Sequence, residues 1–211
     1  MQVPYFAQWE SRALVERFLK SPKEAEQDPL WERSGAKNPA DYARWAGHLC
    51  GMACLKMILA YRDGRELPIV SLAKECVSFG GYKVGLTGEI KGLFYKPFTE
   101  YVRDKYDLRT EVIVDVTVDR ILKELDEGRF FIPSVHPSIR HPENDPPSKG
   151  GHLVLAFGRS SDGAIQFHNP SGFTPQAQED VRLMPDQFAR FFAGRGVLVH
   201  VWPSRGAVAT T

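Results

Sequence analysis

The chain has 211 residues, of which 43% are hydrophobic and 25% are charged, so it is long enough to bury one substantial core. Its 27 Lys and Arg residues nearly balance 26 Asp and Glu residues, giving a formal net charge of +1. This balance argues against nucleic acid or an anionic membrane as a partner. The chain has no apolar run of about 18 residues, and its first residues lack the features of a signal peptide, so we expect a cytoplasmic location.

Apolar residues recur at helical spacing in the first half of the chain, from Glu10 to about Tyr106. Gly80-Gly81 follows one of these patterns as the end of a helix would, and Pro97 suits a first helical turn. We therefore predict a helical amino-terminal half. The patterns cover residues 13–19, 55–59, 69–73 and 98–102.

Short runs rich in Val, Ile and Phe follow Tyr106 and predict β-strands. Helices followed by mostly strands predict an α+β fold of two lobes that share one interface, and functional sites tend to lie in such crevices. The predicted strands are 111–114, 130–135, 152–157, 164–167 and 197–202. The predicted helices between them are 118–125 and 185–192, the second ending at Ala193-Gly194.

Five of the 15 prolines lie between residues 133 and 151. This density predicts a long, stiff surface loop between two strands. The loop ends at Gly150-Gly151, directly before His152. We therefore interpret it as a lid over a site that contains His152.

Cys50 lies in the first turn of a predicted helix that is apolar on most sides, and it is the candidate nucleophile. The helix dipole and the unpaired amides of a first turn stabilise a thiolate, so we expect a lowered Cys50 pKa. The alternative is a small buried hydrophobic residue, as most free cysteines are. Cys54, one turn deeper, and Cys76 are interpreted as core residues. Three cysteines do not form a disulfide framework and fit a reducing compartment.

A thiol nucleophile needs a base, and His152 is the candidate because two glycines before it allow close approach of a substrate. A hairpin joining strands 152–157 and 164–167 would bring the side-chain carbonyl of Asn169 close to the His152 N–H. The alternatives are a solvated histidine and an ordinary turn residue before Pro170. His168 points to the other face. The spacing of the remaining histidines matches no established metal site, so we expect no metal: His48, His136, His141 and His200.

Several segments, in this order, resemble the C39-like cysteine peptidases, which have a papain-like fold. The segments are 3–9 (VPYFAQW), 48–57 (HLCGMACLKM), 122–135, 150–158 (GGHLVLAFG) and 167–170 (FHNP). The resemblance implies a papain-like cysteine protease fold in a single domain, residues 1–211. A helical lobe at about 1–106 would carry the nucleophile helix, and an antiparallel sheet lobe would span about 107–203.

The same resemblance implies a role for each candidate residue. Cys50 is the nucleophile, His152 the general base, Asn169 the residue that orients the imidazole, and Gln8 a donor in the oxyanion hole. Many relatives have Asp at the position of Asn169 and Pro at the position of Met52.

These assignments predict a cysteine peptidase or amidase that acts on a peptide or amide substrate through a Cys50 acyl-enzyme, with no cofactor. Two alternatives stay open. An acyltransferase or peptide ligase would use the same Cys-His-Asn site, with an amine resolving the acyl-enzyme. A non-catalytic module would bind a peptide in the same groove.

Overall fold

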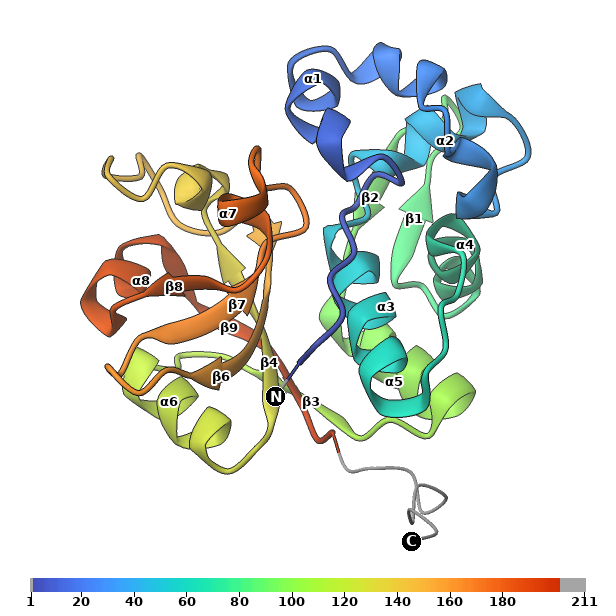
Figure 1. The fold of residues 1–211 in the computed structure, drawn as a ribbon. Coiled ribbons are helices and arrows are strands. Elements are labelled where there is room, and N and C mark those ends of the chain that lie inside the picture. Colours follow the sequence, from blue (N-terminus) through green and yellow to red (C-terminus); the bar gives the residue numbers. More distant parts are fainter. Residues whose placement is uncertain (1, 202–211) are drawn as a thin grey trace, which may run out of the picture.

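A computed structural model describes residues 2–201 as two lobes, with the amino-terminal segment running between them (Figure 1). The first lobe is mainly helical, which confirms the prediction for this half of the chain. Gly80 follows the end of α4 with a φ of +84°, a conformation that glycine adopts without strain. The helices are α1 (Val15–Lys20), α2 (Pro39–Ala46), α3 (Cys50–Asp63), α4 (Ile69–Ser78) and α5 (Tyr95–Tyr106), with 3₁₀ turns η1 (Arg12–Leu14), η2 (Pro22–Gln27) and η3 (Trp31–Ser34).

Two parts of this lobe differ from the prediction. Strands β1 (Tyr82–Val84) and β2 (Ile90–Gly92) form an antiparallel hairpin within the half predicted to be helical. Strands of three residues are too short to show a clear alternation in sequence. Helix α2, which no predicted element covers, begins where the Asn38 side chain accepts a hydrogen bond from the Asp41 amide at 2.8 Å.

The second lobe is built on an antiparallel sheet with strand order β3-β9-β4-β6-β7-β8, and β5 pairs with β4. The α+β prediction is therefore confirmed. The predicted hairpin is also confirmed, since β6 and β7 pair with Leu155 opposite His168. The strands are β3 (Thr110–Ile113), β4 (Phe130–Val135), β5 (His152–Leu153), β6 (Leu155–Arg159), β7 (Ile165–His168), β8 (Val181–Leu183) and β9 (Phe192–Val199). The helices are α6 (Val118–Asp126), α7 (Pro175–Gln178) and α8 (Pro185–Phe191), with the 3₁₀ turn η4 (Pro137–Arg140).

The last strand begins earlier than predicted. Strand β9 starts directly after α8, so Ala193-Gly194 lie in a strand and the prediction that they end a helix is wrong. Gly196 allows β9 to pair closely with β4, because a Cβ at this position would lie 2.4 Å from the Ile132 carbonyl oxygen of β4. Trp202, predicted as the end of this strand, lies outside the described residues. The predicted loop also starts later than Pro133, since β4 continues to Val135.

The sheet separates two cores. Alternate residues of β4 point to opposite faces, with Phe130 and Ile132 in the core of the helical lobe and Phe131 in the core formed with α6 and α8. The start of α3 therefore lies at the interface of the lobes, against β5. No helix among residues 2–201 is long and apolar enough to cross a membrane. The assignment of residues 1–211 to one domain stays a prediction.

Candidate active site

Cys50 is the first residue of α3 and is partly exposed, whereas Cys54 and Cys76 are buried. Gly51, the residue after Cys50, explains why both lobes contact the start of this helix. A Cβ on Gly51 would lie 2.6 Å from Leu93 Cδ2 and 3.0 Å from Leu153 Cδ1. Glycine at position 51 therefore lets a side chain from each lobe pack directly against the start of the helix.

Cys50 and His152 line the same cavity, which has a volume of about 190 Å³. The structure thus brings the two candidate residues together from segments about a hundred positions apart. The remaining lining comes from both lobes: Gly92, Leu93, Tyr95, Ser134, Gly151, Leu153 and Arg195. A larger hollow of about 600 Å³ lies near the starts of α6 and α8, but no Cys or His is among the described residues that line it.

His152 is 5% exposed, and its ring contacts Asn169. This is the contact that the predicted hairpin was expected to bring about. His152 Nε2 lies 2.9 Å from Asn169 Oδ1. The amide of Ser171 donates to the same Oδ1 at 3.1 Å, which identifies that atom as the oxygen. His152 must therefore donate its Nε2–H, and Nδ1 is the unprotonated nitrogen of the neutral ring.

Ser171 and Arg140 extend this contact. Ser171 Oγ lies 3.0 Å from His152 Nε2, and Arg140 donates from Nε to the Ser171 carbonyl oxygen at 2.6 Å. Arg140 Nη2 also donates to Ser171 Oγ. Arg140 belongs to η4, within the proline-rich segment, so this segment is connected to the imidazole through a single residue.

The amino-terminal segment connects Gln8 to both lobes. Gln8 is 3% exposed, its backbone amide donates to the Pro170 carbonyl oxygen at 2.9 Å, and its Nε2 donates to the Ala46 carbonyl oxygen at 3.0 Å. Ala46 lies four residues before Cys50. The Gln8 amide is therefore held beside the start of α3 and next to the turn that carries Asn169.

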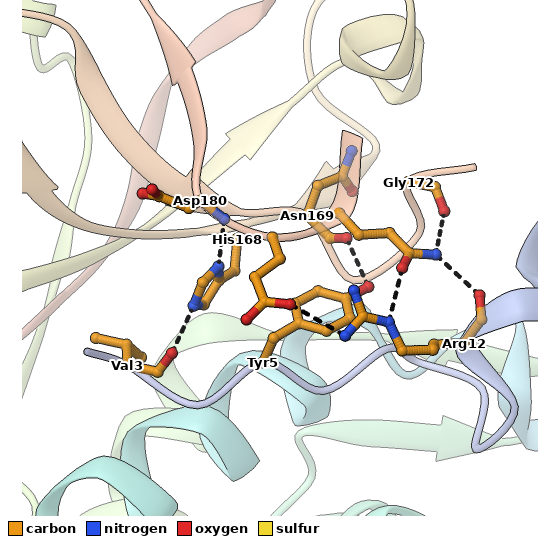
Figure 2. A network of polar contacts seen from close by, with 9 residues as sticks. Val3, Tyr5, Arg12, His168, Asn169, Gly172 and Asp180 are labelled. Carbon is orange, nitrogen blue, oxygen red and sulfur yellow. Dashed lines mark hydrogen bonds and ion pairs between the residues drawn. The ribbon is translucent and has the colours of Figure 1, made fainter. Parts of the chain in front are cut away.

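Figure 2 shows further contacts between this segment and the end of β7. Tyr5 donates its hydroxyl to the Asn169 carbonyl oxygen at 3.1 Å. His168 accepts from the Asp180 amide at Nδ1, 3.1 Å away, and donates from Nε2 to the Val3 carbonyl oxygen at 2.9 Å. Both ring nitrogens of His168 are occupied by backbone groups, so this histidine has a structural role.

Comparison with known proteins assigns the family. The sequence profile of the Peptidase_C39 like family matches residues 2–194. The chain belongs to this C39-like family. A search of curated proteins gave no match.

Two solved structures resemble this C39-like protein. A protein from Bacillus anthracis assigned as a C39-like peptidase superposes with a TM-score of 0.51 at 12% identity, covering 74% of this chain and 90% of the other. The peptidase domain of Streptococcus ComA, a bifunctional ABC transporter involved in a quorum-sensing pathway, gives a TM-score of 0.49 at 16% identity, covering 72% and 92%. The first likeness confirms the papain-like fold.

The electrostatics of the C39-like site differ from one expectation. Burial raises the pKa of the Cys50 thiol, and this outweighs the lowering by the backbone amides of Leu153 and Gly51 and by the charge of Arg140. The expectation of a lowered Cys50 pKa is therefore wrong. Burial, together with the charge of Arg140, lowers the pKa of His152 to about 3. Near neutral pH the free site holds a neutral thiol and a neutral imidazole.

Sequence patterns miss Arg140, Ser171, Ser134 and Arg195. Ser171 donates its amide to the side chain of Asn169 in an Asx turn. The Asn-Pro sequence before it, which favours such turns, is the one local feature that indicates this contact. The others are ordinary residue types brought to the C39-like site by tertiary packing. Among residues 2–201, no group of three or more His, Cys, Asp or Glu side chains is arranged to hold a metal ion.

Proposed function

We propose that this C39-like protein is a cysteine peptidase or amidase that forms an acyl-enzyme on Cys50. One observation carries the proposal: Cys50 shares a cavity with a histidine whose Nε2–H is fixed by an asparagine, which leaves Nδ1 as a base. Family and fold support a peptidase-like function in general. A cytoplasmic location stays a prediction.

The reaction begins from the neutral pair. Cys50 Sγ bonds to the carbonyl carbon of the substrate while its proton passes to His152 Nδ1 and the carbonyl oxygen becomes an oxyanion. The C–N bond then breaks, and the leaving amine takes the proton from His152. Water then adds to the thioester carbonyl while one of its protons passes to His152. The C–S bond breaks to release the carboxylic acid, and the Cys50 thiolate takes that proton back from His152.

The oxyanion needs donors that are already in place. The backbone N–H of Cys50, at the start of α3, is one candidate. The Gln8 side-chain amide is the other, because it carries two N–H groups and one of them is held by the Ala46 carbonyl oxygen. We propose that the second N–H of Gln8 stabilises the oxyanion.

A library of peptides derived from a digested proteome tests the proposal without knowledge of the natural substrate. Cleavage sites would be read by mass spectrometry for the wild type, Cys50→Ala, His152→Ala and Cys54→Ala. We expect cleavage by the wild type and by Cys54→Ala, which removes a thiol one turn deeper on the same helix. We expect no cleavage by the other two variants.

Rapid acid quenching would provide a second readout, a mass increase on the Cys50 peptide equal to the acyl group. Cleavage that persists in Cys50→Ala would refute the assignment of the nucleophile. A repeat with an added amine such as glycinamide separates hydrolysis from transfer, since amide products rather than free acids indicate an acyltransferase. Peptide binding without cleavage or acylation would indicate a binding module.

A further inference from the structure

Arg195 is a cation beside the candidate active site that has no ion-pair partner among residues 2–201. It lies in β9 and lines the cavity that contains Cys50 and His152. Every ion pair found among the described residues involves other cations, and the Arg195 side chain makes no hydrogen bond to a described residue. Its guanidinium, with five N–H donors, is therefore free to bind a ligand.

A second polar group points to the same place. Ser134, in β4, is 3% exposed, lines the same cavity and makes no side-chain hydrogen bond to another described residue. A Cβ on Gly150 would lie 3.1 Å from Ser134 Oγ and 3.2 Å from Arg195 Nη2. The absence of a side chain at Gly150 thus lets a buried hydroxyl and a guanidinium both lie close to the same point of the backbone.

The charge of this cavity favours one class of ligand. Arg195 is its one residue with a full charge near neutral pH, since Cys50 and His152 are neutral and no Asp or Glu lines it among the described residues. A guanidinium and a hydroxyl match the two oxygens of a carboxylate. The volume of about 190 Å³ is below that of a typical small-molecule site, which favours a single side chain over a larger group.

We propose that Arg195 and Ser134 form a subsite for an acidic side chain of the substrate, within a few residues of the bond that is cleaved. This inference rests on the proposed function, because it concerns the substrate of the same site. It identifies Arg195 as a specificity-determining residue and peptides with Asp or Glu near the scissile bond as the preferred substrates.

The peptide library provides the test, because it samples both sides of the cleaved bond. In the wild type we expect Asp or Glu to be enriched at one position within three residues of the cleavage site. The enrichment should vanish in Arg195→Met and be replaced by Lys or Arg in Arg195→Glu. Synthetic peptides that differ by Glu or Gln at that position should differ about tenfold in kcat/KM in the wild type and by less than about twofold in Arg195→Met.

Lys149→Met is the matched control, since Lys149 is an exposed cation that donates to the Ala189 carbonyl oxygen and does not line this cavity. It should keep the Glu over Gln preference. Cleavage without acidic enrichment would overturn the subsite and leave the peptidase proposal intact, whereas no cleavage would end both. An equal loss of preference in Lys149→Met would also overturn the subsite, because the preference would then come from overall positive charge.

Discussion

Arg140 contacts the imidazole of His152 through one intervening residue, Ser171. The guanidinium donates to the Ser171 carbonyl oxygen at 2.6 Å, and the Ser171 hydroxyl lies 3.0 Å from His152 Nε2. Burial lowers the pKa of Arg140 to about 10, so this residue still carries its charge at neutral pH. That charge disfavours the imidazolium and favours the thiolate, and it comes from the segment that we interpret as a lid.

Arg140→Met should make Cys50 less reactive. Removing the positive charge raises the pKa of both the thiol and the imidazole, so less thiolate is present at a given pH. We expect alkylation of Cys50 by iodoacetamide at pH 8 to slow severalfold, as measured by peptide mass spectrometry. Arg190→Met is the control, since Arg190 anchors the same segment through Asp145 and Pro142. Equal rates for Arg140→Met and the wild type would contradict this electrostatic role.

Asn169→Asp should shift the acid limb of the pH profile of kcat/KM to higher pH. In the wild type, His152 stays neutral and able to act as a base down to about pH 3. A carboxylate against Nε2 favours the imidazolium and raises that pKa by roughly one to three pH units, so kcat/KM should begin to fall at a higher pH in the variant. Asn169→Ala, which cannot orient the ring, should lower kcat/KM by about 100-fold at every pH. A profile for Asn169→Asp that overlays the wild type would argue against the assigned base.

Gly51→Ala should affect reactivity more than stability. The added methyl group displaces Leu93 and Leu153, which both line the cavity. The gain in helix propensity, about 1 kcal/mol, offsets much of the packing cost. We expect the free energy of unfolding to change by less than about 1 kcal/mol and kcat/KM to fall by roughly tenfold or more.

Gly47→Ala is the control for that variant, because a Cβ on Gly47 meets nothing within 4 Å. It should retain wild-type kcat/KM. Full activity in Gly51→Ala would show that the cleft tolerates the extra methyl group, against the packing argument.

His152 should make the protein sensitive to acid. Its pKa is about 3 in the folded protein and about 6.5 in an unfolded chain, so the unfolded chain binds one more proton between these values. The stability contributed by this group is present above pH 6.5 and declines as the pH falls, by up to about 1.4 kcal/mol per pH unit. Urea unfolding between pH 7 and 5 gives the slope of the free energy of unfolding against pH. This slope should be shallower in His152→Gln than in the wild type by up to that amount. Equal slopes would mean that the imidazole takes up its proton in the folded protein at the same pH as in the unfolded chain.

Features that depend on residues close in sequence could be predicted. The hairpin of β6 and β7 was predicted because two β-rich runs are separated by a short turn, and its geometry brought Asn169 to His152. Cys50 was placed at the start of a helix because the apolar run begins there. Both inferences use spacing within one segment.

Features that depend on tertiary packing could not be predicted in this way. Arg140 meets Ser171 across 31 positions, and neither residue type stands out in the sequence. The Cys50 pKa was expected to fall because a helix start offers about 0.3–1 kcal/mol of dipole stabilisation. Burial costs the thiolate more, and this burial exists only in the folded chain.

The amino-terminal segment has a practical consequence for handling the protein. Val3 accepts a hydrogen bond from His168 at the end of β7, and Tyr5 and Gln8 bond to the turn that carries Asn169. The Gln8 side chain also donates to the Ala46 carbonyl oxygen, four residues before Cys50. Removing these residues would therefore loosen the support of the imidazole and take away the proposed oxyanion donor at once. Limited proteolysis that cuts within residues 3–8 should therefore disturb the surroundings of His152 even though both lobes stay folded.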